Sequence, residues 1–509
     1  MTWSQGYVTD VDYTFGYYPE LNPAMLDLAC LCHGVAPPLG DKPRYLELGF
    51  GQGVSINLHA AGSDGSYWGT DFNSAHVAGA RTLARVSGAD IRLLEDSFEE
   101  FATRTDLPDF DAIVLHGVWS WITDAGRASV KDIVRQRLRP GGIVYVSYNC
   151  LPGWAPIAPI REMMAICRDR SRSGANGTIL EARALLNELV RAGADCFRDN
   201  PLALHHLETL RRQDPAYLAH EYLNADWRLE NVSALVRDLR DAKLTFLGPA
   251  RLLDAVDAIQ LGVDGRKLIA RFDDAVMRET LRDHLVNRRF RADIFAKGPR
   301  RLTGPELREA WHELAFVLMV PAIDVPKRIP CARGEAELDA QRYDPLIEAL
   351  AGGGYRAKTI DELLATPGLS DRRSEDVAEA LTILAGAGLV SPARPLSVEK
   401  EARCSALNAY ILGRARVSMD LQHLASPATG GGVRATHVGQ LFALAHGEGE
   451  DRAEALAQYV WRFLESVGER LTKDGNRLEA KDDNLRALMP SAERFLKFDQ
   501  PHLRGLRVI

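Results

Sequence analysis

Between residues 43 and 148 the chain alternates short apolar runs with longer segments of helical periodicity. The runs begin at Tyr45, Tyr67, Ile91, Ala112 and Ile143. Strands separated by crossovers of this length pair in parallel and carry helices on both faces of their sheet. The pattern therefore predicts five strands of a doubly wound, Rossmann-like α/β sheet.

Residues 160–240 have a different pattern, an Arg- and Leu-rich helical periodicity without strand-like runs. Strand-like runs return at 244–247 and 290–295, with a helical segment between them. We expect these runs to be the sixth and seventh strands of the same sheet, so that the helical segment is an insertion. Because ligands of such sheets bind at the carboxyl ends of the strands, the insertion is expected to lie over that edge.

The rest of the chain predicts a mainly helical C-terminal region. A strand at 316–320 and helices near 341–351, 359–366 and 373–388 indicate a winged-helix-like module, and residues 400–509 indicate further helices around a loop at 426–432. The presumptive recognition helix, which begins at Arg372, carries acids beside its arginines, so we favour a protein-docking or structural role over DNA binding.

We expect five divisions of the chain. They are the ligand-binding core at 1–160, the helical insertion at 161–240, the remainder of the sheet at 241–300, the winged-helix-like module at 301–398 and the C-terminal helical region at 399–509.

Composition and charge argue against several classes of protein. The 62 Lys and Arg residues against 69 Asp and Glu leave a net charge of −7, which supplies no broad basic face for nucleic acid. No stretch approaches about 18 uninterrupted apolar residues, and the N-terminus lacks the features of a secretory signal. We therefore expect a cytoplasmic protein without membrane insertion.

No metal site is expected. The seven cysteines are scattered, which is typical neither of a disulfide framework nor of a zinc site. His220-Glu221 begins like a zinc-protease motif, but Asn224 stands where the second zinc ligand is needed.

The turn after the first strand carries the strongest chemical signal. Gly49, Gly51 and Gly53 permit positive φ and close approach of a ligand, and the helix that follows offers free N–H groups. A dinucleotide fingerprint needs a glycine at position 54, where the chain has Val54, and Glu47 precedes the turn. This pattern suits a nucleoside with a cationic amino-acid part better than a pyrophosphate.

Acidic residues follow the second and third strands. Asp71 lies 18 residues after Gly53, where a carboxylate can accept both ribose hydroxyls. Asp96 and Ser97 end the third strand, where an acceptor and a backbone N–H can read an adenine edge. Together with the glycine turn they favour S-adenosylmethionine as the cofactor, with NAD as the lesser alternative.

Aromatic and amide side chains follow the fourth and fifth strands, in Leu115-His-Gly-Val-Trp-Ser-Trp-Ile122 and Ser147-Tyr-Asn-Cys-Leu-Pro-Gly-Trp154. Methyl transfer needs a nucleophile held in line, and aromatic faces tolerate the positive charge of a sulfonium. Asn149 could orient an attacking amine, and Tyr148 or His116 could accept a proton. The alternative is that Trp119 and Trp121 pack a core and that His116 is structural.

On these motifs the chain resembles the bacterial class I methyltransferases that carry a methyltransferase regulatory domain, a group that includes protein-lysine methyltransferases acting on outer-membrane proteins. The resemblance rests on Glu47-Leu-Gly-Phe-Gly-Gln-Gly53, His116-Gly-Val-Trp-Ser-Trp121 and Tyr148-Asn-Cys-Leu-Pro-Gly-Trp154, and it continues through His220-Glu-Tyr-Leu-Asn224, Asn287-Arg-Arg-Phe-Arg291 and Leu424-Ala-Ser-Pro427.

The resemblance implies a seven-stranded catalytic core, a helical regulatory part and a C-terminal region that helps to hold substrate. It also implies an aromatic lid over the cofactor, with Tyr13, Phe15 and Tyr17 in the candidate positions. Phe50 stands where relatives often carry a smaller residue, which should alter packing near the methionine part of the cofactor.

The expected function is S-adenosylmethionine-dependent N-methylation of lysine side chains in a protein or peptide. Two alternatives stay open: O-methylation of a glycan, a peptide carboxylate or a small biosynthetic intermediate, and a non-catalytic regulatory protein that binds the cofactor. The oligomeric state is left open. The expected catalytic residues are His116, Trp119, Tyr148 and Asn149, and the expected cofactor-binding residues are Tyr13, Glu47, Gly49, Phe50, Gly51, Gly53, Asp71, Phe72, Asp96, Ser97 and His116.

Overall fold

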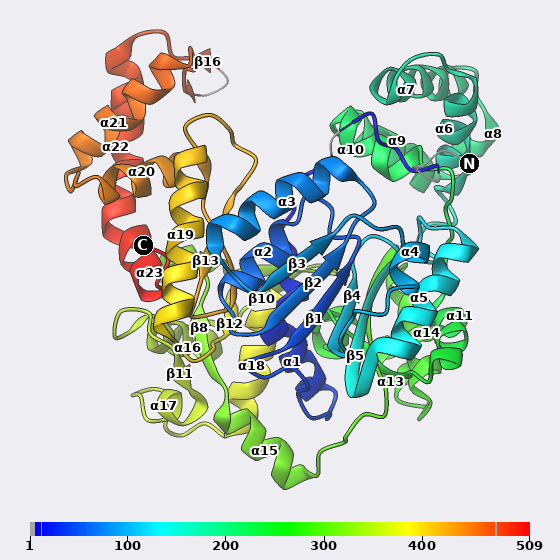
Figure 1. Cartoon of the computed structure of the whole chain (residues 1–509), viewed down its shortest axis with the longest axis horizontal. Coiled ribbons are helices and arrows are strands. Elements are labelled where there is room, and N and C mark those ends of the chain that lie inside the picture. Colours follow the sequence, from blue (N-terminus) through cyan, green and yellow to red (C-terminus); the bar gives the residue numbers. More distant parts are fainter. Residues whose placement is uncertain (1–5, 12, 474–475) are drawn as a thin grey trace.

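A seven-stranded mixed sheet forms the centre of the molecule (Figure 1). The computed structural model describes residues 6–11, 13–473 and 476–509. The strand order is β3-β2-β1-β4-β5-β7-β6. The strands are β1 (Arg44–Leu48), β2 (Ser66–Thr70), β3 (Ile91–Leu94), β4 (Phe110–Leu115), β5 (Leu138–Asn149), β6 (Thr245–Pro249) and β7 (Phe290–Ala296).

All seven predicted strands lie in this one sheet, so that prediction is confirmed. β1 to β5 pair in parallel as expected, whereas β7 runs antiparallel to both β5 and β6. The carboxyl ends of the five parallel strands therefore meet at one edge, where the loops with the candidate residues begin.

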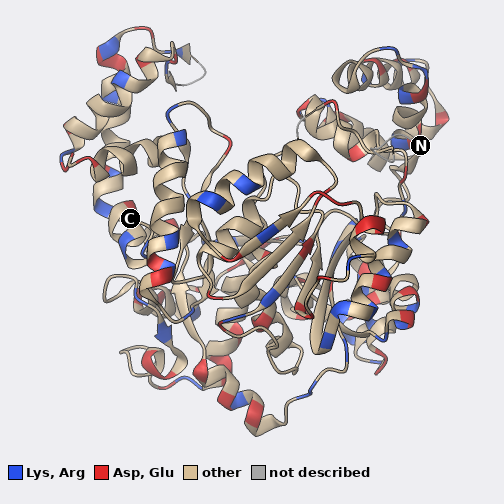
Figure 2. Ribbon diagram, viewed as in Figure 1, with Lys and Arg blue, Asp and Glu red and all other residues tan. Residues whose placement is uncertain are grey.

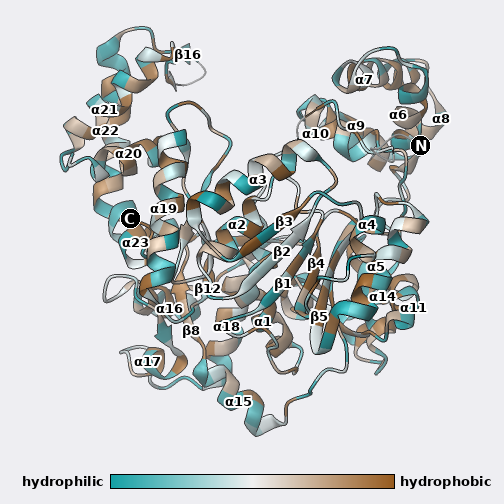
Figure 3. Cartoon of the chain, viewed as in Figure 1, coloured by the Kyte–Doolittle hydropathy of each residue, from teal (hydrophilic) through white to brown (hydrophobic). Residues whose placement is uncertain are grey.

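Helices cover both faces of the sheet because its strands alternate their side chains between two cores. On β1, Tyr45 points into one core and Leu46 into the other. The first core includes residues of α1 (Pro23–Cys32), α2 (Val54–Ala61) and α3 (Ser74–Ser87). The second includes residues of α4 (Phe98–Ala102), α5 (Asp124–Arg137), α11 (Val232–Leu239) and α14 (Ala275–Val286). Figure 3 shows these apolar strands between helices with polar outer faces.

The helical insertion between β5 and β6 has a core of its own. Its helices are α6 (Ala158–Arg170), α7 (Ala175–Arg191), α8 (Asp195–Arg198), α9 (Pro201–Leu210) and α10 (Pro215–Tyr222). Ile179 of α7 and Leu207 of α9 are fully buried in that core, and Val8 and Val11 of the N-terminal segment pack against it. The N-terminal segment therefore joins the insertion to the sheet.

The next part of the chain contains the predicted strand and the three predicted helices. They are α16 (Ala340–Ala351), α17 (Ile360–Leu364) and α18 (Ser374–Gly386), with an antiparallel sheet of β8 (Ala315–Leu318), β11 (Lys358–Thr359) and β12 (Val390–Pro392). The sequence analysis did not predict α15 (Gly304–Glu313) or the hairpin of β9 (Arg328–Cys331) and β10 (Gly334–Glu337).

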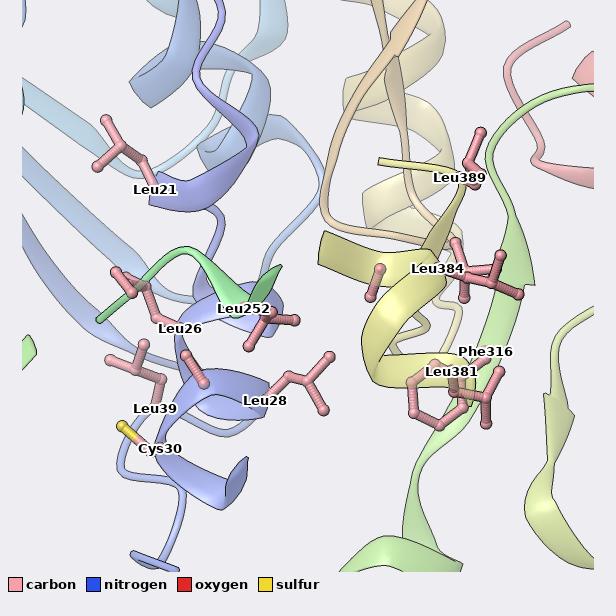
Figure 4. Packing of buried hydrophobic residues seen from close by; sticks show 14 of the residues in the cluster. Leu21, Leu26, Leu28, Cys30, Leu39, Leu252, Phe316, Leu381, Leu384 and Leu389 are labelled. Carbon is pink, nitrogen blue, oxygen red and sulfur yellow. The ribbon is translucent and has the colours of Figure 1, made fainter. Parts of the chain in front are cut away.

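The helix in the recognition position, α18, packs inward against α1 and η3 (Leu252–Ala255) beside the seven-stranded sheet. Leu28 of α1 and Leu252 point towards the helix that carries Leu381 and Leu384 (Figure 4). A Cβ on Gly386 of α18 would lie 2.8 Å from the backbone nitrogen of Leu253. This packing buries Leu381 and Leu384 of α18.

The C-terminal helices pack against α2 and α3, which cover one face of the sheet. They are α19 (Val398–Arg414), α20 (His437–Gly447), α21 (Ala453–Ser466), α22 (Lys481–Arg494) and α23 (Gln500–Gly505). Their core includes Leu58 of α2 and Leu83 of α3, and the Arg403 guanidinium bonds Asp64 at 2.7 Å. The predicted loop at 426–432 is the tip of a hairpin of β13 (His423–Ser426) and β14 (Gly431–Arg434).

Short elements complete the chain. They are η1 (Pro19–Leu21), η2 (Arg240–Ala242), η3 (Leu252–Ala255), α12 (Asp257–Gln260), α13 (Val263–Ile269), η4 (Ala322–Asp324), β15 (Thr472–Lys473), β16 (Asn476–Arg477) and η5 (Phe495–Asp499). Charged residues of both signs are interspersed over the outer helices (Figure 2). Across residues 6–11, 13–473 and 476–509, no helix has the length and apolar character needed to cross a bilayer.

Candidate active site

The glycine turn after β1 has the backbone conformation that its sequence predicts. Gly49, Gly51 and Gly53 have φ values of 76°, 56° and 70°, which side chains with a Cβ rarely adopt. A Cβ on Gly49 would lie 2.6 Å from Cγ2 of Val118. The turn therefore depends on glycine both for its conformation and for its close packing.

This turn is bound to the end of β2 by a hydrogen bond. The Gly51 backbone N–H donates to Oδ2 of Asp71 at 2.8 Å, and the Asn73 N–H donates to Oδ1 of the same carboxylate at 2.9 Å. The His76 ring nitrogen Nδ1 lies 3.3 Å from that Oδ1. Asp71 is thus held rigidly at the edge of the sheet, in the place predicted for a ribose-binding acid.

One cavity brings together most of the residues predicted to bind the cofactor. It opens at the carboxyl ends of β1 to β4 and is closed by the N-terminal segment. Its lining residues are Tyr7, Tyr13, Gly49, Gly51, Asp71, Phe72, His76, Asp96, Ser97, Phe98, His116, Gly117, Val118, Trp121, Ile122 and Thr123. Three predicted residues do not line it: Glu47 is buried in β1, Phe50 is buried against Gly69, and Gly53 caps the start of α2.

The end of β3 differs in one respect from the prediction for an adenine-reading site. The Ser97 N–H donates to the Glu100 carboxylate at 2.8 Å, because Ser97 and Glu100 form the capping box of α4. The Asp96 carboxylate faces the cavity while bonded to Arg104 at 3.1 Å. The Ser97 N–H is therefore already bonded and cannot donate to a ligand, whereas the Asp96 carboxylate can still accept a hydrogen bond from one.

Glu47 lies in β1 just before the glycine turn and is almost completely buried. Its Oε2 atom has no hydrogen-bond partner in the described part of the chain. Burial, together with the nearby Asp71 carboxylate, raises the pKa of Glu47 to about 8. A buried acid of this kind is costly in its ionised form unless a cation pairs with it.

The N-terminal segment crosses the cavity and is held from both sides. On the insertion side, the Val8 N–H donates to Oδ1 of Asn224 at 3.0 Å. On the sheet side, the Gln52 amide donates to the Tyr13 carbonyl at 3.1 Å, and the Tyr18 N–H donates to the Ser55 hydroxyl at 2.9 Å. The segment is therefore fixed over the cofactor cavity as a lid.

The predicted aromatic lid is only partly built from the expected residues. Tyr13 lines the cavity, and so does Tyr7, which the sequence analysis did not single out. Tyr17 instead stacks near His423, with ring centroids 4.8 Å apart, and Phe15 packs against the C-terminal core.

A second cavity of about 450 Å³ adjoins the first and shares Tyr7, Tyr13, His116, Gly117 and Trp121 with it. The helical insertion forms its far wall, as expected for an insertion over the strand ends. The remaining lining residues are Thr14, Tyr18, Asn149, Trp154, Ile157, His206, Gln213, Tyr217, His220, Glu221, Tyr222, Arg251, Arg289 and Phe290.

Two of the four predicted catalytic residues line the second cavity, and one of them also lines the first. His116 lines both; its Nδ1 lies 2.8 Å from the Tyr145 hydroxyl, and burial lowers its pKa to about 4, so the ring is neutral near pH 7. Asn149 lines the second cavity, and its Nδ2 has no hydrogen-bond partner in the described residues. An amide with free capacity there can orient a polar acceptor.

The other two predicted catalytic residues lie elsewhere. Tyr148 is buried in the sheet, and its hydroxyl donates to Asp293 at 2.6 Å, which leaves it without access to either cavity. Trp119 is buried in the core beneath the fourth strand, whereas Trp121 reaches both cavities. Tyr148 and Asn149 point in opposite directions because successive side chains alternate along β5. The course of the loop after β4 buries Trp119 and brings Trp121 to the cavities.

Several site residues had no signal of their own in the sequence. Tyr18, Tyr217 and Arg289 lie on segments far apart in the chain that the fold brings to one cavity. Glu221 lies in His220-Glu-Tyr-Leu-Asn224, a motif that carries part of the family resemblance and begins like a zinc motif, but it is not among the predicted site residues. Among the described residues, no three His, Cys, Asp or Glu side chains are grouped to hold a metal ion.

Comparison with known proteins identifies two regions of this chain. Residues 46–142 match a family described as a methyltransferase domain, and residues 214–297 match one described as a predicted methyltransferase regulatory domain. An uncharacterized protein of Synechocystis, sll1526, is 36% identical over 97% of both chains. An uncharacterized protein of Rickettsia prowazekii, RP789, is 26% identical over 56% of this chain and 51% of its own.

Among solved structures, PKMT2 from Rickettsia typhi has the same fold over nearly the whole chain. The TM-score is 0.67 at 16% identity, with 96% of this chain and 99% of the other covered. The structure of PKMT2 in complex with AdoHcy gives a TM-score of 0.68 at 16% identity, with 95% and 98% covered.

Proposed function

This chain belongs to the S-adenosylmethionine-dependent methyltransferases that carry a methyltransferase regulatory domain, and we propose that it methylates lysine side chains of a protein. The observation that carries the proposal is the pair of adjoining cavities. The residues shared between them mark the point where donor and acceptor would meet.

The lining of the second cavity suits a lysine side chain. Tyr7, Tyr13, Tyr18 and Trp121 supply aromatic faces, which favour a cationic acceptor. Its volume of about 450 Å³ leaves room for an extended side chain with part of its backbone. Similarity to PKMT2, a protein-lysine methyltransferase, supports the proposal at the level of fold.

The residues of the chain would position both partners. The cofactor, when bound, supplies a methyl group on a sulfonium sulfur. Asp71 and Asp96, which line the first cavity, would hold its nucleoside. Glu47, whose buried Oε2 has no hydrogen-bond partner among the described residues, would pair with its amino group. The side-chain carbonyl of Asn149 would accept an N–H of the acceptor amine and leave the amine lone pair free, and the lid segment would keep water from the junction.

The test is methyl transfer from labelled S-adenosylmethionine to short peptides with one central lysine and randomised flanks. Matched libraries with central serine or glutamate serve as controls. We expect label on lysine nitrogen, located by mass spectrometry and stable to mild base. Label confined to serine, or base-labile label on glutamate, would instead establish an O-methyltransferase.

A further inference from the structure

Glu221 is an acidic side chain that lines the acceptor cavity, and its carboxylate has no counter-ion among the described residues. It is the one Asp or Glu among the described residues that line this cavity, and no hydrogen bond or ion pair with another described residue satisfies its carboxylate. Arg251, which also lines the cavity, is already paired with Glu20 at 3.1 Å. The carboxylate is therefore available to a ligand.

The surroundings of Glu221 are aromatic. Tyr7, Tyr13 and Tyr18 of the lid segment and Tyr217 and Tyr222 of α10 all lie within electrostatic range of its carboxylate. Asp214 caps the N-terminus of α10, and its side chain accepts a hydrogen bond from the Ala216 N–H at 2.7 Å. This cap stabilises the helix that carries Glu221. A carboxylate ringed by aromatic faces is a binding site for an ammonium group.

We propose that Glu221 binds the ammonium group of the incoming lysine and accepts its proton before methyl transfer. This inference rests on the proposed function, because it names the group that makes the lysine nucleophilic. Glu221 lies outside the glycine turn and outside the loops after the fourth and fifth strands, in His220-Glu-Tyr-Leu-Asn224 of the helical insertion.

The proton balance of the step is simple. The lysine ammonium transfers one proton to the Glu221 carboxylate, which leaves a neutral amine and a neutral carboxylic acid. The amine lone pair then forms the N–C bond while the C–S bond breaks with its electron pair going to sulfur. The protonated product amine leaves, and the proton on Glu221 returns to solvent.

Burial raises the pKa of Glu221 to about 7, which suits a base that works near neutral pH. The other titratable or charged groups around the cavity are the five tyrosines, His116, His206, His220, Arg251 and Arg289. Burial lowers the pKa of both His116 and His206 to about 4, so these two rings stay neutral near pH 7.

The decisive experiment compares wild type, Glu221→Gln and Glu208→Gln by the pH dependence of kcat/KM on the lysine peptides. Glu208 is an exposed residue of α9, so its substitution is a matched loss of one charge in the same insertion. We expect Glu221→Gln to lower kcat/KM at pH 7 by about 100-fold or more. The affinity for S-adenosylhomocysteine should stay unchanged in both variants, which also verifies folding.

The shape of the profile separates proton transfer from simple packing. With Glu221 as the base, wild-type kcat/KM rises through pH 7 and then levels off, because the enzyme binds the protonated lysine. In Glu221→Gln only free neutral amine can react, so kcat/KM should rise about tenfold per pH unit towards the lysine pKa near 10.4. Wild type should bind a peptide with norleucine in place of lysine more weakly than it binds the lysine peptide. Glu221→Gln should bind the two peptides equally well.

The outcomes distinguish the two proposals. If wild type methylates lysine while Glu221→Gln keeps wild-type kcat/KM and the same plateau, this inference is overturned and the proposed function stands. If wild type transfers no methyl group to lysine, both are overturned.

Discussion

The buried acid before the glycine turn leads to a prediction about cofactor binding and pH. Glu47 has a pKa of about 8 in the folded protein, whereas the unfolded chain ionises it near 4.5. Between these values the folded state holds a proton that the unfolded state has lost. Stability of the cofactor-free protein therefore falls as pH rises from 4.5 to 8, by at most about 5 kcal/mol at 1.36 kcal/mol per unit.

The bound amino group of the cofactor needs the ionised carboxylate, so binding has the opposite pH dependence. At pH 6 about one Glu47 in 100 is ionised, and at pH 7 about one in ten. We expect the affinity for S-adenosylhomocysteine to rise about tenfold between pH 6 and 7, with release of nearly one proton per molecule bound. Glu47→Gln should bind more weakly at pH 7.5 and lose this dependence.

Two measurements test this reasoning. Calorimetry in buffers of different ionisation enthalpy counts the protons released, and thermal unfolding at pH 5 and pH 8 compares the cofactor-free proteins. Glu47→Gln should gain stability relative to wild type at pH 8 but not at pH 5. An affinity of wild type that is flat from pH 6 to 7.5, or proton release that persists in Glu47→Gln, would refute the pairing of Glu47 with the amino group.

Three further predictions concern other parts of the site and the fold. Gly53→Ala should lower the free energy of unfolding by about 2 kcal/mol or more and weaken cofactor binding, because the new Cβ overlaps that of Ala80. The control Gly88→Ala, with a similar φ of 65° and open space around it, should lower the free energy of unfolding by only about 1 kcal/mol, as measured by thermal unfolding. Arg394→Met should lower the free energy of unfolding by about 3 kcal/mol at pH 7, because it removes the guanidinium that lies 2.6 Å from the buried Asp27 carboxylate. The loss should be smaller at pH 5, where protonation neutralises that carboxylate, and an equal loss at both pH values would contradict this reasoning. Asn149→Ala should lower kcat about tenfold or more with the cofactor affinity unchanged, and a parallel loss of cofactor binding by calorimetry would argue for a structural role instead.

Local chemistry made the cofactor half of the site predictable from the sequence. The positive φ of Gly49, Gly51 and Gly53 needs glycine, and the parallel strands bring their carboxyl ends to one edge. Residues that follow those strands therefore meet, as Asp71, Asp96 and His116 do. Even here the direction of a side chain was open, and Tyr148 points into the sheet towards Asp293 while the next residue, Asn149, faces the cavity.

Only the tertiary structure decided the acceptor half. Its walls come from the lid segment, from α10 and from the start of β7. Tyr7 and Phe290, at the extremes, are 283 residues apart, and the three segments share no local pattern. Glu221 belongs to this cavity because α10 folds over the sheet edge and is held to the lid by the bond between Asn224 and Val8. Backbone geometry is encoded by neighbouring residues, whereas a cavity between segments depends on long-range packing that no single stretch of sequence specifies.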